Sequence, residues 1–324
     1  MLVRFGYVAI ALNLENASTS KTVTLSNLHK LENSEQKLLR IHRIARENLD
    51  NLLRVIRYNI GEHIHVYRFT SKLFPFATYP LEFEWNYADI FATELAAIGE
   101  LIKKSGMRVS AHPDHFTVIN SPDEKVFADS AKDLEYHDNI LTAMGLNEDY
   151  KLVIHLGGFY GDKKESTSRF LRNFYRLPSR VQTRLMLEND DKIYSAEEVL
   201  KVCQELQLPM VLDIHHHACN PSGELTKLLP AIWATWPKGL PKIHVSSPKD
   251  GQRSRHHADY VEASSVIEFF NIAQPLARDF DIMVEAKMKD QAMFKLISDI
   301  SKYPEIELFD PTTATQYRPI PGNQ

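Results

Sequence analysis

Histidines and acidic residues recur in this chain at the ends of short apolar runs. Imidazoles end the runs in SAHP, VIHLGG and PKIHVSS, and carboxylates end those in LMLEND, VLDIHHH and VEAK. The candidate side chains are His112, His155, Glu188, Asp213, His216, His244 and Glu285, with His257 in the loop after PKIHVSS. Neutral imidazole and carboxylate together suit zinc, manganese, iron or cobalt, whereas oxygen ligands alone would favour magnesium or calcium. The mixture predicts a transition-metal site.

These candidate ligands outnumber those that one tetrahedral or octahedral ion takes from a protein. Two or three ions that share carboxylates are the economical interpretation, and Glu188 and Asp213 are the candidates for bridging. A single histidine at a strand end is more often a structural hydrogen-bonding residue than a ligand. Several carboxylates and imidazoles crowded at one place are different, because burying them without a cation would be costly.

The HHH run at 215–217 offers more imidazoles than one site can use. Neighbouring side chains of an extended backbone point to opposite sides, so only some members of the run can face inward. We expect His216 to be the ligand. We expect His215 and His217 to point outward or to support the ligands from behind.

Strand-like runs of apolar and β-branched residues alternate along the chain with segments of helical periodicity. The runs are 3–8, 64–69, 108–111, 152–154, 185–187, 210–212, 242–245 and 282–284. Helical segments between them include 34–60, 87–106 and 195–207, the last opening with Ser195 and Glu198 at capping-box spacing. This alternation predicts parallel strands closed into a TIM (β/α)8 barrel, with a doubly wound open sheet as the alternative. Functional groups of such barrels gather where the strands end, so the candidate ligands are expected at one mouth.

The composition of the 324 residues is that of an ordinary globular protein, with 44% hydrophobic and 25% charged residues. We expect one catalytic domain over 1–309 and an irregular C-terminal tail over 310–324. No apolar run is long enough to span a bilayer, and two cysteines are too few for a disulfide framework, so a cytoplasmic protein is predicted. The net charge of −4 argues against wrapping nucleic acid by bulk electrostatics, although bound divalent ions would reverse the sign locally.

The order and spacing of the motifs resemble those of the UV damage endonuclease (UvsE/UVDE) family over roughly 1–301. The motifs are RFGYVA, YRFTSKLFPFA, AHPDHF, VIHLGGFYGDK, LENDDK, LDIHHHACNP, PKIHVSS, HADYV and MVEAKMKD. The resemblance implies a barrel related to endonuclease IV and xylose isomerases. It also implies a DNA repair endonuclease, a hydrolase that nicks immediately 5′ to cyclobutane dimers and 6-4 photoproducts with a divalent-metal cluster, most simply of manganese.

The same resemblance carries over the eight candidate ligands as metal ligands, each in its family motif. It places Lys242, with Glu188, in the catalytic machinery, Lys242 being either a phosphate contact or a modified side chain. Tyr7 and Asn13 match positions near the damaged nucleotides. Hydrolysis itself requires a nucleophile to approach an anionic phosphodiester, and we expect the cluster's carboxylates to position a hydroxide for this attack.

Two positions depart from the family pattern. Tyr79, in ATYP, stands where the family has a histidine, so activity is expected to be altered if an imidazole is needed there. A phenol can still hydrogen-bond a phosphate, and Tyr79 is counted as catalytic on that ground. His115 stands before Phe116 where the family has glutamine before an aromatic residue, so the aromatic wedge is kept and its polar partner is changed.

Damaged double-stranded DNA is the expected partner, and no obligate protein partner is indicated. Photoproducts weaken stacking, and Phe116 with His115 is expected to fill the gap that an extruded lesion leaves. Lys72, Lys163 and Arg253 fall in predicted loops and offer a basic rim, along with Lys164, Lys249 and Arg255. The alternatives are a metal-dependent sugar isomerase or epimerase, an AP endonuclease, and a damage-binding barrel that has lost turnover through Tyr79.

Overall fold

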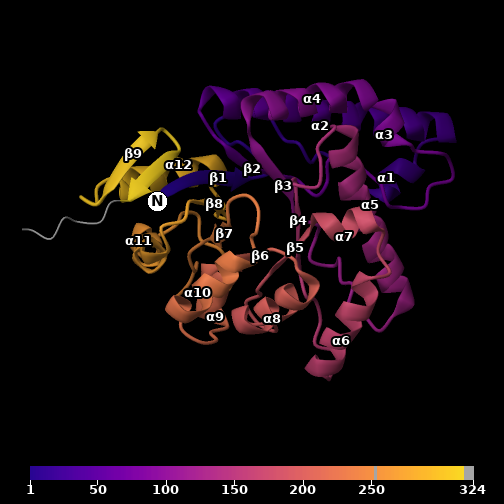
Figure 1. The fold of residues 1–324 in the computed structure, drawn as a ribbon. Helices are drawn as coiled ribbons and strands as arrows, with labels where there is room; N and C mark the ends of the chain where they lie inside the picture. The colour runs from indigo at the N-terminus through magenta and orange to yellow at the C-terminus, as the bar shows by residue number, and fades with distance from the viewer. Residues whose placement is uncertain (252–253, 317–324) are drawn as a thin grey trace, which may run out of the picture.

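Eight parallel strands close into a barrel at the centre of the molecule (Figure 1). The computed structural model describes residues 1–251 and 254–316. The barrel strands are β1 (Leu2–Val8), β2 (Val66–Phe69), β3 (Arg108–Ala111), β4 (Leu152–His155), β5 (Leu185–Glu188), β6 (Met210–Asp213), β7 (Lys242–Val245) and β8 (Phe280–Val284). Each strand pairs in parallel with the next, and β8 pairs with β1 to close the ring. The predicted TIM barrel is confirmed, and the open sheet is wrong.

Helices surround this ring in the alternation that the sequence predicts. They are α1 (Leu25–His29), α2 (Ser34–Gly61), α3 (Tyr87–Ile90), α4 (Ala92–Ser105), α5 (Glu124–Ala143), α6 (Lys163–Phe174), α7 (Ser179–Arg184), α8 (Ala196–Leu206), α9 (Ile214–Cys219), α10 (Leu225–Ala234), α11 (Ala263–Ala273), the short 3-10 helix η1 (Gln274–Leu276) and α12 (Lys289–Ile300). The predicted capping box of Ser195 and Glu198 opens α8. Within the described residues, no helix combines the length and the apolar character needed to cross a membrane.

The segment 87–106, predicted as one helix, is divided in two. Phe91 leaves helical geometry, with φ −112° and ψ 24°, and its ring is fully buried. The ring packs against Phe74 from the loop after β2 in a tilted arrangement, with 5.8 Å between ring centroids. Tertiary packing of this ring accounts for the break, which helical periodicity alone does not reveal.

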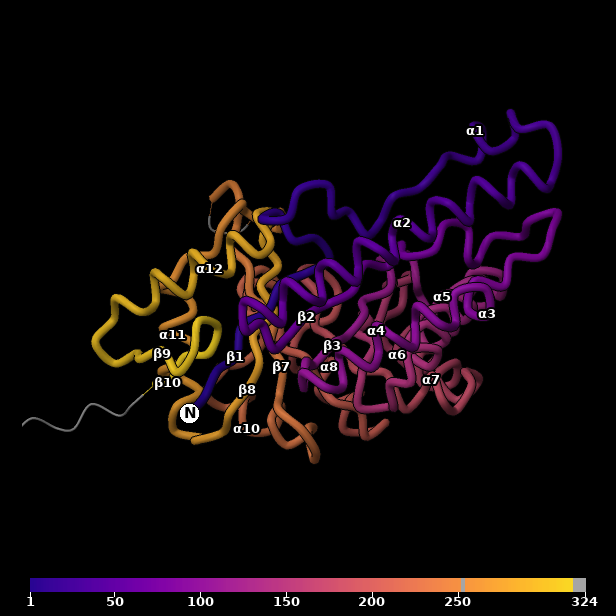
Figure 2. The backbone as a smooth tube through the Cα atoms, turned by 90° about the horizontal axis from the view of Figure 1, so that it is seen from above, coloured from indigo at the N-terminus to yellow at the C-terminus, as the bar shows by residue number. Residues whose placement is uncertain are grey.

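A hairpin extends the sheet beyond the barrel. Strands β9 (Ile306–Asp310) and β10 (Thr313–Gln316) are antiparallel, and β10 pairs with β1 so that Thr315 lies opposite Leu2. Figure 2 shows both strands beside the N-terminus. The irregular tail predicted from residue 310 is therefore wrong for 313–316, because β10 is specified by pairing with a distant strand. Residues 317–324 lie outside the described part of the chain.

A buried carboxylate ties the strands together at the amino-terminal end of the barrel. Asp281 of β8 is 0% exposed, and it accepts hydrogen bonds from Arg4 Nε at 2.8 Å and from Arg108 Nη1 at 2.5 Å. Burial opposes the charged form of Asp281, yet Arg108 and Arg4 hold its pKa below the ordinary value. Because the two arginines come from β1 and β3, this one side chain links strands from both ends of the barrel sequence.

We expect Asp281→Asn to destabilise the fold by about 3 kcal/mol. This value is the lower end of the usual cost of breaking a buried ion pair, because both arginines are partly exposed. The folded pKa of Asp281 is lowered, so its stabilisation is present above about pH 4 and is lost as the pH falls through the folded pKa. Urea unfolding at neutral and at acidic pH measures both effects. Asp50→Asn, on the exposed face of α2, is the control. Equal losses of unfolding free energy in the two variants would refute a stabilising role for the contacts of Asp281 with Arg4 and Arg108.

Candidate metal centre

Side chains from the carboxyl ends of β3 to β8 converge at one mouth of the barrel. The described residues contain three groups whose possible ligand atoms lie within 4.8 Å of one another. They are His112 with His155 and Glu188, Glu188 with His244 and Glu285, and Glu188 with Asp213 and His216. The fold thus brings together seven of the eight predicted ligands, and Glu188 belongs to every group.

Glu188 lies at the centre of this cluster and is 1% exposed. Its Oε2 lies 3.1 Å from His112 Nε2, and its Oε1 accepts a hydrogen bond from His244 Nδ1 at 2.8 Å. Burial disfavours the charged form, yet His244 and His155, followed by His112, hold the pKa of Glu188 well below the ordinary value. Both oxygens of a charged carboxylate therefore face ring nitrogens from different strands, as a shared metal ligand requires.

Several imidazoles of the mouth are oriented by backbone carbonyls. The acceptors are the carbonyl oxygens of Pro113, Asn189 and Glu285, at 2.9, 3.0 and 2.7 Å from the Nδ1 atoms of His112, His216 and His257. A carbonyl oxygen can only accept, so each Nδ1 carries the proton and each Nε2 is left with its lone pair. This is the tautomer that ligand histidines adopt when a second hydrogen bond orients them.

His257 is the predicted ligand outside the three groups. Its ring centroid lies 6.1 Å from that of His216. The loop after β7 brings it there, and an isolated bridge between Pro248 and His257 holds that loop against itself. His257 therefore borders the cluster without sharing its tight spacing.

Asp213 ends β6 and caps helix α9. Its Oδ1 accepts a hydrogen bond from the backbone N–H of His216 at 2.8 Å, while its buried Oδ2 has no hydrogen-bond partner among the described residues and lies 3.7 Å from His216 Nδ1. Burial raises the pKa of Asp213, and His216 offsets this only in part. An unpaired carboxylate oxygen in a buried place is costly unless a cation meets it, so this atom fits a metal ligand.

The HHH run is helical, which corrects the argument from an extended backbone. Its residues lie in α9, where side chains spread around the axis by the helical period. His216 does face the cluster, with Nδ1 at 3.6 Å from Glu188 Oε1. His215 and His217 do not point outward to solvent, because they are 4% and 8% exposed. The cap at Asp213 starts this helix directly after the strand.

Arg68 of β2 is a site residue that the sequence analysis missed. Its guanidinium donates a hydrogen bond to Glu285 Oε1, which also lies 2.9 Å from His244 Nδ1. Burial opposes the charged form of Glu285, but Arg68 and His244 hold its pKa well below the ordinary value. The position of Arg68 near the end of a strand, in the run YRFTS, was the signal that would have found it.

Lys242 lies inside the barrel below the ligands. It is 1% exposed, and its Nζ donates a hydrogen bond to Ser110 Oγ at 3.0 Å. Burial, with Arg108 nearby, lowers the pKa of Lys242 well below the ordinary value. This burial does not fit a direct contact with a DNA phosphate. A modified side chain stays a prediction.

The two residues predicted near the damaged nucleotides lie in different surroundings. Tyr7 is 0% exposed, and its hydroxyl donates a hydrogen bond to Asn59 Oδ1 at 2.7 Å. A direct contact with DNA does not fit this burial, because the ring packs among core side chains between β1 and α2. Asn13 is exposed after β1, and its amide donates to the Tyr58 hydroxyl at 3.1 Å, so its predicted role stays open to test.

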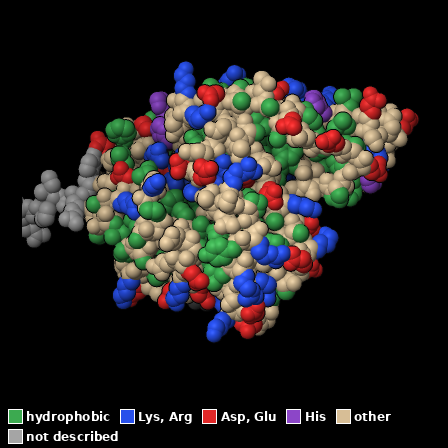
Figure 3. Space-filling model, turned by 45° about the vertical axis from the view of Figure 1, so that its right-hand side comes forward, with side chains coloured by type: hydrophobic (Ala, Val, Ile, Leu, Met, Phe, Trp, Pro, Cys, Tyr) green, Lys and Arg blue, Asp and Glu red, His purple; other side chains and the backbone are tan. Residues whose placement is uncertain are grey.

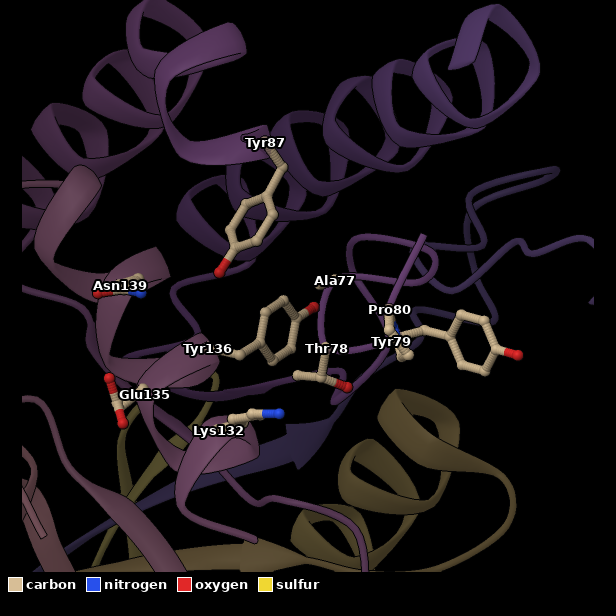
Figure 4. Close-up of a pocket in the computed structure, with 9 residues that line it drawn as sticks. All are labelled: Ala77, Thr78, Tyr79, Pro80, Tyr87, Lys132, Glu135, Tyr136 and Asn139. Atoms are coloured by element: carbon tan, nitrogen blue, oxygen red, sulfur yellow. The ribbon is translucent and has the colours of Figure 1, made fainter. Parts of the chain in front are cut away.

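Tyr79 lies in the loop after β2 with 46% of its surface exposed. It packs edge-on to Phe76, with 5.9 Å between ring centroids. Figure 4 shows its side chain pointing away from Tyr87 and Tyr136, which line the same pocket. Tyr79 belongs to none of the hydrogen-bonded contacts described above around Glu188, and its catalytic role stays a prediction.

His115 and Phe116 stand exposed in the loop after β3, with 5.5 Å between their ring centroids. Phe116 is 60% exposed, which is unusual for a large apolar ring. Its exposure is compatible with the predicted wedge, which stays a prediction.

The predicted basic rim is only partly free to meet an anion. Lys72 is 62% exposed and lies 3.6 Å from Asp114 Oδ2, whereas Lys163 is paired with Glu198 Oε1 at 2.7 Å. Arg253 lies outside the described residues. Figure 3 shows acidic and basic side chains mixed over the face it displays. Of the two described residues of this rim, Lys163 is thus engaged by an acidic partner within the protein.

A family model described as UV-endonuclease UvdE matches residues 3–318. The chain belongs to this family. A UV DNA damage endonuclease of Bacillus mycoides (strain KBAB4) is 39% identical over 316 residues, which are 97% of this chain and 99% of that protein. The crystal structure of SacUVDE aligns with a TM-score of 0.82 at 32% identity, covering 93% of this chain and 98% of that chain. Endonuclease IV from Thermus thermophilus shares the fold, with a TM-score of 0.52, 16% identity and coverage of 78% and 95%.

In this UvdE family member, we expect Glu188→Gln to lose more than one equivalent of bound metal, since the carboxylate belongs to all three ligand groups. Glutamine keeps the shape but removes the charge and one acceptor oxygen. Elemental analysis after manganese loading and dialysis measures the loss. Glu307→Gln, exposed on β9, is the matched control, and unchanged metal content in Glu188→Gln would contradict the shared-ligand assignment.

Proposed function

We propose that the chain is a divalent-metal-dependent DNA repair endonuclease that nicks damaged double-stranded DNA immediately 5′ to UV photoproducts. The convergence of predicted ligands on Glu188 in a UvdE family chain carries this proposal. Two or three ions, most simply manganese, would be held by the cluster, and cyclobutane dimers and 6-4 photoproducts are the proposed lesions. The cytoplasmic location and the lack of an obligate protein partner stay predictions.

The three groups of possible ligands support the proposal of more than one ion. His112 and His155 with Glu188 would hold one ion, and Asp213 and His216 with the same glutamate another. His244 and Glu285 complete the third group. Bound ions would supply a nucleophile at neutral pH from water and would neutralise negative charge on the phosphodiester.

Arg68 supports the same chemistry from beside the cluster. Its contact with Glu285 fixes the carboxylate, and its side chain is 13% exposed, so part of the guanidinium faces the mouth. A guanidinium offers five donors in a planar fork that matches phosphate oxygens. Arg68 can therefore orient a ligand and meet the anionic backbone of DNA.

Lesion recognition would rest on the exposed ring of Phe116. Photoproducts weaken base stacking, which lowers the cost of extruding nucleotides by a few kcal/mol. An exposed ring in the loop that follows His112 can occupy the space that an extruded lesion leaves. Such a ring favours DNA over a small sugar as the substrate, because a sugar pocket would enclose its aromatic groups.

The decisive measurement compares three labelled duplexes, which contain one cyclobutane dimer, one abasic site or no damage. With manganese, we expect a nick immediately 5′ to the dimer, slower cleavage at the abasic site and an intact undamaged strand. Chelation should abolish the nick, because the ligands act through bound ions. Glu188→Gln should slow it at least about a hundredfold, since loss of a ligand exceeds the effect of its supporting hydrogen bonds.

Each alternative function predicts a different result in this cleavage assay. Faster cleavage at the abasic site would favour an AP endonuclease. Tight binding of the dimer without a break would favour a damage-binding barrel, and no effect on any duplex would end the nuclease proposal.

A further inference from the structure

The loop between β4 and α6, residues 156–162, carries two exposed aromatic rings that the metal cluster does not explain. Phe159 is 49% exposed and Tyr160 is 45% exposed. The loop begins directly after His155, so both rings stand at the rim of the mouth. Large apolar rings presented side by side next to a catalytic cluster need a functional explanation.

The backbone of this loop adopts a costly conformation. Tyr160 has φ +46°, in the left-handed region that non-glycine residues avoid, and the nearby Gly157 has φ +99°. A Cβ at Gly157 would lie 2.4 Å from Asn120 Oδ1, so no larger residue fits there. Strained residues persist only where the surroundings impose them, and they cluster at functional sites.

Asn120 is the residue that imposes the conformation. It is 0% exposed, its Nδ2 donates to Gly158 O at 2.8 Å, and its Oδ1 accepts from Gly158 N at 3.0 Å. Asn120 follows Phe116 in the loop after β3. This reciprocal pair therefore fastens the loop that carries Phe159 to the loop that carries Phe116.

Helix α6 contacts the loop at both aromatic residues. The hydroxyl of buried Ser166 donates to Phe159 O at 2.7 Å, and the Arg169 guanidinium lies 5.7 Å from the centroid of the Tyr160 ring. Tyr160 is thereby packed from one side, while Phe159 has only its carbonyl anchored and its ring projects. These contacts hold the backbone of the loop in place and leave the ring of Phe159 exposed.

We propose that Phe159 is a second stacking contact for a nucleobase, carried on a loop that is bonded to the loop of Phe116, so that both loops meet the distorted duplex. This inference rests on the proposed function and extends it to the contact surface of the lesion. Every nucleobase presents a π face, and aromatic side chains beside nucleic-acid channels stack on bases without regard to sequence. Lys164, exposed at the start of α6 and without an ion pair among the described residues, suits the adjacent phosphate.

Binding of labelled duplexes tests the contact, with calcium in place of manganese and gels to show that the strand stays intact. The duplexes are undamaged or carry one cyclobutane dimer, with 2-aminopurine beside or opposite the lesion. We expect Phe159→Ala to bind the dimer duplex at least about fivefold more weakly and to lose the quenching of 2-aminopurine that stacking produces. Phe159→Trp should keep both, and undamaged DNA should bind unchanged.

Tyr175→Ala is the matched control, because its ring is 67% exposed at the far end of α6. Melting temperatures should be unchanged in all three variants, since exposed side chains contribute little to stability. If Phe159→Ala matches Tyr175→Ala in affinity and emission, Phe159 does not touch a base. Equal weakening on damaged and undamaged duplexes would also overturn the proposal.

The measurements distinguish a failure of the stacking proposal from a failure of the endonuclease proposal. A parent chain that nicks the dimer duplex, with Phe159→Ala behaving as the parent, refutes the stacking contact and leaves the endonuclease intact. A parent chain that neither nicks nor prefers the dimer refutes the endonuclease. In that case, quenching of 2-aminopurine in single-stranded DNA, compared between the parent and Phe159→Ala, still decides for or against stacking.

Discussion

Three carboxylates are buried together at one mouth of the barrel, and the surrounding residues compensate their charge. Glu188 and Asp213 are almost fully buried, and Glu285 lies beside them. Burying such groups costs several kcal/mol each unless cations and hydrogen-bond donors surround them. Ring nitrogens and the guanidinium of Arg68 compensate part of this buried negative charge. The Oδ2 atom of Asp213 has no hydrogen-bond partner among the described residues. Divalent ions, as proposed, would compensate the remaining negative charge.

The amino-terminal end of the barrel carries stabilising contacts, whereas the carboxyl end carries the candidate site. At the amino-terminal end, Asp281 is matched by Arg4 and Arg108, and the β9–β10 hairpin covers the free edge of β1. At the other end, the loops carry exposed rings and left-handed backbone such as that of Tyr160. TIM barrels separate these tasks in this way, because the strand ends hold the ligands while the opposite face maintains the closed ring.

Because the net charge of the chain is −4, contact with DNA would depend on the charges and aromatic rings at the barrel mouth. Nonspecific attraction would need a broad basic surface, and paired lysines such as Lys163 do not provide one. In the proposed function, bound ions, Arg68 and the exposed rings would concentrate the attraction where a phosphodiester and unstacked bases lie. Selectivity for distorted DNA would follow from this arrangement, because an undistorted duplex presents its bases stacked and out of reach.

Local sequence determined the eight strands, the order of the helices and most of the candidate ligands that the fold brings together. The alternation of apolar runs predicts parallel strands, and residues such as His155 and Glu188 are recognised because they end those runs. Tertiary structure alone decided the helical HHH run, the contact of Arg68 with Glu285, the burial of Tyr7 and the pairing of β10 with β1. It also decided the bond between Asn120 and Gly158 that fastens the loop carrying Phe159. The reason is physical: periodicity and caps act within a few residues, whereas side-chain partners and strand edges are chosen by groups that meet only once the ring has closed.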